Sequence, residues 1–173
     1  MANNILNHKG NQIGKSIKEE NCEKIIEEIF EISKQNSCSI TYPIDVLVGK
    51  DLNSVSKIKG LNEIDKDDLI LDIGPKTINA IKKVIENSET VLWNGPAGYF
   101  ENPNFANGSY EIANSIIKKN KNKSIYSVVG GGDTIALING IKATRDFNFV
   151  STAGGAFLEY LEGKELPGIK ALN

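Results

Sequence analysis

Two glycine runs, each followed by a segment predicted to be helical, are the residues of this chain best suited to hold a ligand. The first is Gly130-Gly131-Gly132-Asp133-Thr134 and the second is Ser151-Thr152-Ala153-Gly154-Gly155-Ala156. Both follow an apolar, β-branched segment. Glycine has no Cβ to keep a ligand from the backbone, and the first N–H groups of a helix lack acceptors and lie at its positive end. The two runs therefore predict a phosphate-rich ligand.

Asp133 has two interpretations from the residues alone. An aspartate at the start of a helix is commonly an N-cap, whose carboxylate accepts a backbone N–H. A carboxylate beside a phosphate-binding turn is also a ligand for Mg²⁺, which prefers one or two carboxylates together with phosphate oxygens. In the second interpretation the Thr134 hydroxyl could donate to the same phosphate. The residue types leave both open.

A third unusual run is Trp93-Asn94-Gly95-Pro96-Ala97-Gly98-Tyr99-Phe100-Glu101. One interpretation is a tight loop with Trp93 in the core. The other is a rigid slot for a purine ring, with the Glu101 carboxylate accepting from ribose hydroxyls. Gly14-Lys15-Ser16 is not a P-loop, because the position that must be glycine is Lys9, and no G-x-G-x-x-G fingerprint occurs.

Strands and helices are predicted to alternate along the chain. Apolar β-branched runs predict strands at 39–48, 69–73, 90–93, 124–129 and 148–150, whereas helical spacing predicts helices at 77–87, 109–119 and 133–140. A capping-box pattern at Ser16-Ile17-Lys18-Glu19 predicts a helix from there to about Gln35. Residues 49–67 are polar and predict an excursion outside the core.

This alternation predicts an α/β fold with one parallel sheet and helices on both faces, a Rossmann-like three-layer sandwich. Ligands bind such sheets outside the carboxyl ends of the strands. The glycine-bearing turns that follow the strands are therefore expected to share one edge of the sheet.

Composition is that of an ordinary globular protein with one domain. The net charge of −2 argues against a nucleic-acid partner, and the lysines of 118–123 are interpreted as solvated charges at a helix end. Cys22, Cys38 and His8 show no metal-type spacing. Neither a long apolar stretch nor signal-peptide features occur, so a cytoplasmic protein without a membrane partner is expected.

Several runs, in this order, resemble the nucleotide-binding, C-terminal domain of phosphoglycerate kinase. The matching runs are Asp45-Val46, Leu71-Asp72-Ile73-Gly74-Pro75, Trp93-Asn94-Gly95-Pro96, Phe100-Glu101, Gly130-Gly131-Gly132-Asp133-Thr134, Ser151-Thr152, Gly154-Gly155-Ala156, Leu158-Glu159 and Leu166-Pro167-Gly168. The resemblance covers essentially the whole chain. It implies that residues 1–173 are part of that domain.

The resemblance implies reversible phosphoryl transfer between 1,3-bisphosphoglycerate and ADP, giving 3-phosphoglycerate and Mg-ATP. Asp133 is implied as the ligand of the Mg²⁺ in Mg-ADP or Mg-ATP, and Gly154 and Gly155 as N–H donors to the transferring phosphoryl group. The residues implied to hold the nucleotide are Gly74, Asn94, Pro96, Ala97, Glu101, Gly130, Gly131, Gly132, Asp133 and Thr134. Ala153 stands where the family has glycine, which requires a negative φ at that residue.

Met1-Ala2-Asn3 resembles an interior segment of the family, so we expect the chain to be N-terminally truncated. The N-terminal substrate domain with its arginines, and the strand and helix that carry the phosphate-binding lysines, are expected to be absent. On this view 3-phosphoglycerate or 1,3-bisphosphoglycerate binds only if an N-terminal domain is supplied, and the isolated chain is inactive. The alternatives are a non-catalytic remnant and the nucleotide-binding half of a split enzyme.

Overall fold

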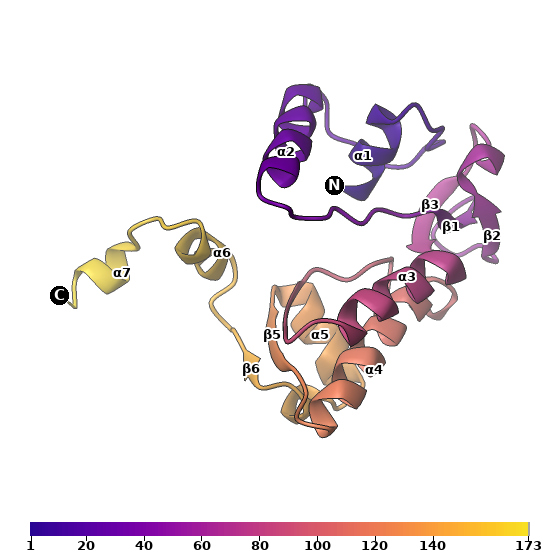
Figure 1. Cartoon of the computed structure of the whole chain (residues 1–173). Coiled ribbons are helices and arrows are strands. Elements are labelled where there is room, and N and C mark those ends of the chain that lie inside the picture. Colours follow the sequence, from indigo (N-terminus) through magenta and orange to yellow (C-terminus); the bar gives the residue numbers. More distant parts are fainter. Residues whose placement is uncertain (173) are drawn as a thin grey trace. The chain divides into compact units, whose positions relative to one another are not determined.

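The structure is a computed structural model, and it describes residues 1–172 (Figure 1). Where the sequence predicts one domain, the tertiary contacts divide the chain into two compact units. Unit 1 comprises Met1–Lys83 and Ala97–Glu111, and unit 2 comprises Val84–Pro96 and the chain from Ile112 onward. None of the helices within 1–172 has the length and apolarity needed to cross a membrane.

Unit 1 contains a small antiparallel sheet and helices (Figure 1). Its elements are α1 (Ala2–His8), α2 (Glu23–Gln35), β1 (Asp45–Gly49), β2 (Lys57–Gly60), η1 (Leu61–Glu63), β3 (Leu69–Ile73), most of α3 (Pro75–Glu86), η2 (Pro103–Phe105) and the start of α4 (Asn107–Lys121). The strand order is β2-β1-β3, and the fully buried β1 is central. Its Val46 and Val48 form an apolar cluster with Ile64, against which Leu61 and Ile70 pack.

Unit 2 contains a parallel sheet of order β4-β5-β6, of which Figure 1 labels β5 and β6. Its elements are the end of α3, β4 (Thr90–Asn94), most of α4, β5 (Tyr126–Gly130), α5 (Gly132–Gly140), η3 (Thr144–Asp146), β6 (Phe149–Val150), α6 (Gly155–Leu161) and α7 (Pro167–Lys170). Asn94 is in register with Gly130, and Val129 with Val150. The carboxyl ends of the three strands therefore lie at the same edge of this sheet.

The α/β class is confirmed, but the expected parallel sheet is realised only by β4, β5 and β6. Both neighbours of β1 run antiparallel to it. The connection from β1 to β2, residues 50–56, is shorter than the dozen or more residues that a parallel pair needs. The polar segment 49–67, predicted to be an excursion, in fact supplies the edge strand β2.

The predicted capping box at Ser16 is wrong, because α2 begins at Glu23 with Cys22 as its N-cap. The Ser16 hydroxyl instead accepts a hydrogen bond from the Ile70 N–H at 2.8 Å, across 54 positions of sequence. A serine that resembles a local cap thus serves a long-range contact, and Ser16 is buried for that reason.

The lysine run at the end of α4 is not solvated throughout. The Lys119 ammonium donates hydrogen bonds to the carbonyl oxygens of Ile85, Glu86 and Ser88, where α3 ends. The last carbonyls of a helix have no intrahelical donors, and a cation there also complements the helix dipole. Lys119 therefore links the two helices within unit 2.

Candidate functional site

The turn after β4 is fixed on both sides of Gly95. Gly95 has a φ of +103°, a conformation that favours glycine. Its carbonyl oxygen accepts from the Trp93 indole N–H at 2.9 Å, and its N–H donates to the Thr134 hydroxyl oxygen at 2.7 Å. Trp93 is buried, and its ring lies 6.4 Å from that of Phe147, centroid to centroid. The prediction of a tight loop with Trp93 in the core is confirmed.

The start of the turn after β5 is covered by the side chain of Asn94, the last residue of β4. A Cβ built on Gly130 or Gly131 would lie 3.1 or 3.0 Å from the Asn94 Oδ1. The Gly130 position also meets the Phe157 ring of α6 at 3.1 Å, and Gly131 has a φ of +85°. A side chain at either position would crowd the Asn94 and Phe157 side chains, and Gly131 also has a backbone conformation that favours glycine. Phe157 of α6, the helix that the second glycine run starts, thus packs close to the first glycine run.

Asp133 is not a helix cap. The N-cap of α5 is Gly131, and no side chain forms a cap hydrogen bond at this end of the helix. Asp133 lies in the first turn with its side chain exposed. The N-cap interpretation is therefore wrong, and the carboxylate is presented to solvent beside the first amides of α5. Around Gly132, a Cβ would meet no atom within 4 Å, so the space beside these amides is open.

The second glycine run follows β6 and starts α6. Ser151 is buried, and its N–H donates to the Val129 carbonyl at 2.8 Å, which continues the pairing of β6 with β5. Gly154 has a φ of +54°, whereas Ala153 is outside the residues of positive φ, as its methyl group requires. Cβ positions at Gly154 and Gly155 meet nothing within 4 Å. The backbone of this turn is accessible.

Gly74, predicted to line a nucleotide pocket, lies in unit 1 and is buried. A Cβ there would lie 2.3 Å from the carboxyl carbon of Asp45. That carboxylate accepts hydrogen bonds from the N–H of Lys76 at 2.9 Å, and from the N–H and hydroxyl of Thr77 at 2.8 and 2.7 Å. Asp45 thus satisfies the N-terminal amides of α3, and Gly74 provides the space.

Ala97 and Glu101 also belong to unit 1. The Ala97 N–H donates to the buried Ser109 hydroxyl at 2.9 Å, and the Glu101 side chain is exposed. Of the sequence-predicted residues, unit 2 brings together at its sheet edge Asn94, Pro96, Gly130, Gly131, Gly132, Asp133, Thr134, Gly154 and Gly155. The expectation that the turns share one edge is confirmed for this set.

Asp72 stands in one of the runs that resemble the family, but its burial as a titratable group was not predicted. Its carboxylate is 1% exposed and accepts hydrogen bonds from the N–H groups of Gly108 and Ile73, each at 2.8 Å. Burial raises the pKa of Asp72 from 3.8 to about 6, although the two N–H donors oppose that rise. Its Oδ1 would lie 2.5 Å from a Cβ at Gly98 and 2.3 Å from one at Gly108. The absence of a side chain at Gly98 and Gly108 is therefore a sequence feature that the buried Asp72 carboxylate requires.

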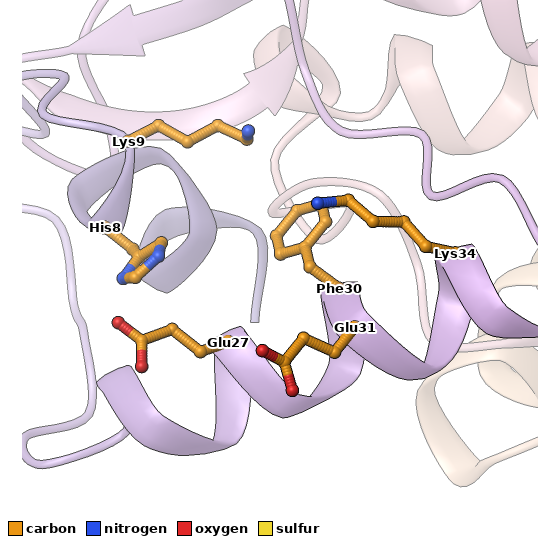
Figure 2. Close-up of a pocket in the computed structure, with 6 residues that line it drawn as sticks. All are labelled: His8, Lys9, Glu27, Phe30, Glu31 and Lys34. Atoms are coloured by element: carbon orange, nitrogen blue, oxygen red, sulfur yellow. The ribbon is translucent and has the colours of Figure 1, made fainter.

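A cleft of about 440 Å³ lies between α1 and α2 in unit 1, lined by His8, Lys9, Glu27, Phe30, Glu31 and Lys34 (Figure 2). The Lys9 ammonium stands 4.7 Å from the ring centroid of Phe30 and 4.8 Å from that of Tyr42. The aromatic surface here is already covered by a cation of the chain itself. None of the sequence-predicted site residues lines this cleft.

Comparison with known proteins decides the family. The family model described as phosphoglycerate kinase matches residues 1–164. The chain belongs to the phosphoglycerate kinase family. Over 99% of its length it is 42% identical to the phosphoglycerate kinase of Zymomonas mobilis and 40% identical to that of Xanthobacter autotrophicus.

Solved phosphoglycerate kinases share the fold of the chain. The enzyme from Coxiella burnetii superposes with a TM-score of 0.91 at 37% identity, and that from Pyrococcus horikoshii with a TM-score of 0.71 at 27% identity. Each comparison covers 99% of this chain, but only 44% and 42% of those chains. The chain likewise spans 44% of the length of the Zymomonas and Xanthobacter relatives.

Proposed function

We propose that the chain is the nucleotide-binding, C-terminal part of a phosphoglycerate kinase, and that it holds Mg-ADP or Mg-ATP at the carboxyl edge of the unit 2 sheet. The observation that carries the proposal is the meeting of three glycine-bearing turns at that edge, with the exposed Asp133 in the first turn of α5. Phosphate groups suit this edge because the N-terminus of α5 lies there and the space at Gly132, Gly154 and Gly155 is open.

The donor set suits Mg²⁺ bound as part of the nucleotide. Within residues 1–172 no cluster of three or more histidine, cysteine, aspartate or glutamate side chains could form a complete metal cage. Mg²⁺ commonly takes one or two carboxylates and completes its shell with phosphate oxygens and water. Asp133 would supply the carboxylate and the nucleotide the phosphate oxygens. The role of the ion in transfer is to neutralise charge on the phosphates.

The other predicted residues divide by their accessibility. Asn94 ends β4 and Pro96 follows it, and both would border the nucleotide. Gly130, which ends β5, and the next two glycines would lie beneath its phosphates. Thr134 has no exposed surface and its hydroxyl oxygen accepts the Gly95 N–H, so it would support the nucleotide site through that turn. By the family resemblance, Gly154 and Gly155 would face the transferring phosphoryl group. Gly74, Ala97 and Glu101 belong to unit 1, and their role toward the nucleotide stays a prediction from that resemblance.

In a complete enzyme the reaction would be reversible transfer between 1,3-bisphosphoglycerate and ADP, in which catalysis is mostly positioning and charge neutralisation. The triose substrate would be held by a domain outside residues 1–173. We therefore propose that this chain alone binds nucleotide and does not turn over. Turnover of the isolated chain near ordinary kinase rates, about 1–100 s⁻¹, would contradict this proposal.

Calorimetric titration with Mg-ADP tests the binding claim. We expect the wild-type chain to bind, and Asp133→Ala to lose most of the Mg²⁺-dependent affinity. Asp67→Ala is the matched control, because Asp67 is exposed and its ion pair with Lys15 lies in unit 1. No binding by the wild-type chain would favour a remnant without nucleotide function. Binding unchanged in Asp133→Ala would overturn the assignment of Mg²⁺ to Asp133.

A further inference from the structure

The Thr134 hydroxyl is used within the protein. Thr134 is 0% exposed, and its Oγ1 accepts the Gly95 N–H at 2.7 Å. The third residue of α5 therefore holds the turn that follows β4. A hydroxyl without exposed surface has no path to a phosphate, so the side chain must act through the turn that it binds.

The orientation of the Gly95 peptide depends on this contact, because few other hydrogen bonds hold the turn. Pro96 has no N–H, and the Gly95 carbonyl is already bound by the Trp93 indole. At Gly95 no Cβ restricts the backbone, and its φ of +103° lies in a region that glycine enters and leaves freely. Without the Thr134 hydroxyl, the N–H side of Gly95 would lose the acceptor that fixes the peptide plane.

The contact is matched by a second one in the opposite direction. Asn94, directly before Gly95, places its Oδ1 against Gly130 and Gly131, just before α5. The Asn94 side chain, at the end of β4, thus reaches toward the turn after β5, and the Thr134 side chain of α5 reaches back to Gly95. Asn94 and Thr134 thus add side-chain contacts between the two turns, beyond the pairing of β4 with β5 that ends at Asn94 and Gly130.

We infer that Thr134 is a positioning residue that holds Asn94 and Gly95 at the distance from the α5 amides that the nucleotide phosphates require. This inference rests on the proposed nucleotide site. It assigns to the threonine of the Gly-Gly-Gly-Asp-Thr run a role between two turns, in place of a direct contact of its hydroxyl with the ligand. Preorganised turns bind more tightly because less ordering remains to be done on binding.

Three variants of the full chain separate this role from a general loss of stability. Thr134→Val replaces the hydroxyl by a methyl group of similar size, and Thr134→Ser keeps the hydroxyl. Ser127→Ala is the matched control, since Ser127 is also buried in unit 2 but bonds Asn148 near the start of β5. Two measurements are made on each: exchange of the Gly95 amide proton by NMR, and Mg-ADP affinity by calorimetry.

We expect Thr134→Val to speed Gly95 exchange and to weaken Mg-ADP binding by roughly five- to tenfold, the effect of losing about one hydrogen bond. Thr134→Ser should restore both, and Ser127→Ala should leave both near wild type while lowering the urea midpoint. Unchanged exchange in Thr134→Val, or faster exchange with unchanged affinity, would overturn the inference. If the wild-type chain does not bind Mg-ADP, the proposed function fails, and the exchange comparison alone decides whether Thr134 fixes the turn.

Discussion

The carboxylate of Asp45 occupies the space in which a side chain on Gly74 would stand. A Cβ at residue 74 would lie 2.3 Å from the Asp45 Cγ and 2.5 Å from its Oδ2. The carboxylate cannot move away without releasing the N–H groups of Lys76 and Thr77 at the start of α3. Gly74 is thus needed by the fold of unit 1, whatever it contributes to ligand binding.

Gly74→Ala should therefore destabilise the protein by about 2–3 kcal/mol, because overpacking a buried site forces its neighbours apart. Urea unfolding followed by circular dichroism measures the change. Gly140→Ala is the control, because a Cβ at Gly140, the last residue of α5, meets nothing within 4 Å. Equal urea midpoints for the two variants would contradict this prediction, because they would show that the Asp45 carboxylate can shift without loss of stability.

Asp72 should make stability fall as the pH rises through the weakly acidic range. Its pKa is raised from 3.8 to about 6 in the folded chain, so between these values the folded state binds more protons than the unfolded state. The contribution of Asp72 to the free energy of unfolding is full below about pH 3.8 and is lost as the pH rises through about 6. Two units of pKa correspond to roughly 3 kcal/mol at most.

Asp72→Asn should remove that fall, since an amide does not titrate. Unfolding midpoints measured at intervals from about pH 4 to 7 should decline more steeply in the wild type than in the variant. Asp67→Asn serves as the control, because Asp67 is exposed and pairs with Lys15. A decline of the same slope in wild type and Asp72→Asn would contradict the assignment.

Asp68 should have the opposite effect on the pH dependence of stability: its contribution should be lost as the pH falls. Burial alone would raise its pKa, but hydrogen bonds from Lys50, Lys59 and the Asp65 N–H outweigh burial and lower the pKa from 3.8 to about 2. The stabilisation is present above about pH 3.8 and is lost as the pH falls through about 2. Asp68→Asn should lower the urea midpoint at neutral pH, and the difference from wild type should shrink on acidification.

Removing the Lys119 ammonium should loosen α3 from α4 within unit 2. Lys119→Met keeps the aliphatic stem and deletes the donors to the carbonyls of Ile85, Glu86 and Ser88. We expect a loss of about 1–2 kcal/mol in urea unfolding, from one cation at a helix C-terminus and its hydrogen bonds. Lys118→Met, at an exposed position in the same helix, should change the midpoint little.

The predictions that held are those whose determinants are local. Strand 69–73 was predicted with the bounds of β3, and the helix at 133–140 begins one residue earlier in α5, because apolar period and bounding glycines mark both. The contact of Ser16 with Ile70 could not be predicted, since it joins residues 54 positions apart. The antiparallel pairing of β1 with β2 and β3 depends on partners that periodicity does not name.

The candidate site follows the same division. Glycine runs after strands predicted which turns would meet at the sheet edge of unit 2, because parallel strands place their carboxyl ends together. The sequence could not show that Gly131 and not Asp133 is the N-cap, or that the Thr134 hydroxyl is directed to Gly95. The N-cap is decided by the backbone φ of Gly131, and the partner of the Thr134 hydroxyl is decided by which turn lies beside α5 in the folded sheet.

A nucleotide site at the edge of the unit 2 sheet is tested most directly by an amide-resolved NMR titration of the wild-type chain with Mg-ADP. We expect chemical-shift changes at Asn94 and Gly95, at 130–134 and at Gly154 and Gly155, and we expect these changes to require Mg²⁺ at Asp133. The α1–α2 cleft, at His8 and Phe30, should not respond. An absence of changes up to millimolar nucleotide, or changes centred on that cleft, would contradict a nucleotide site at the edge of the unit 2 sheet.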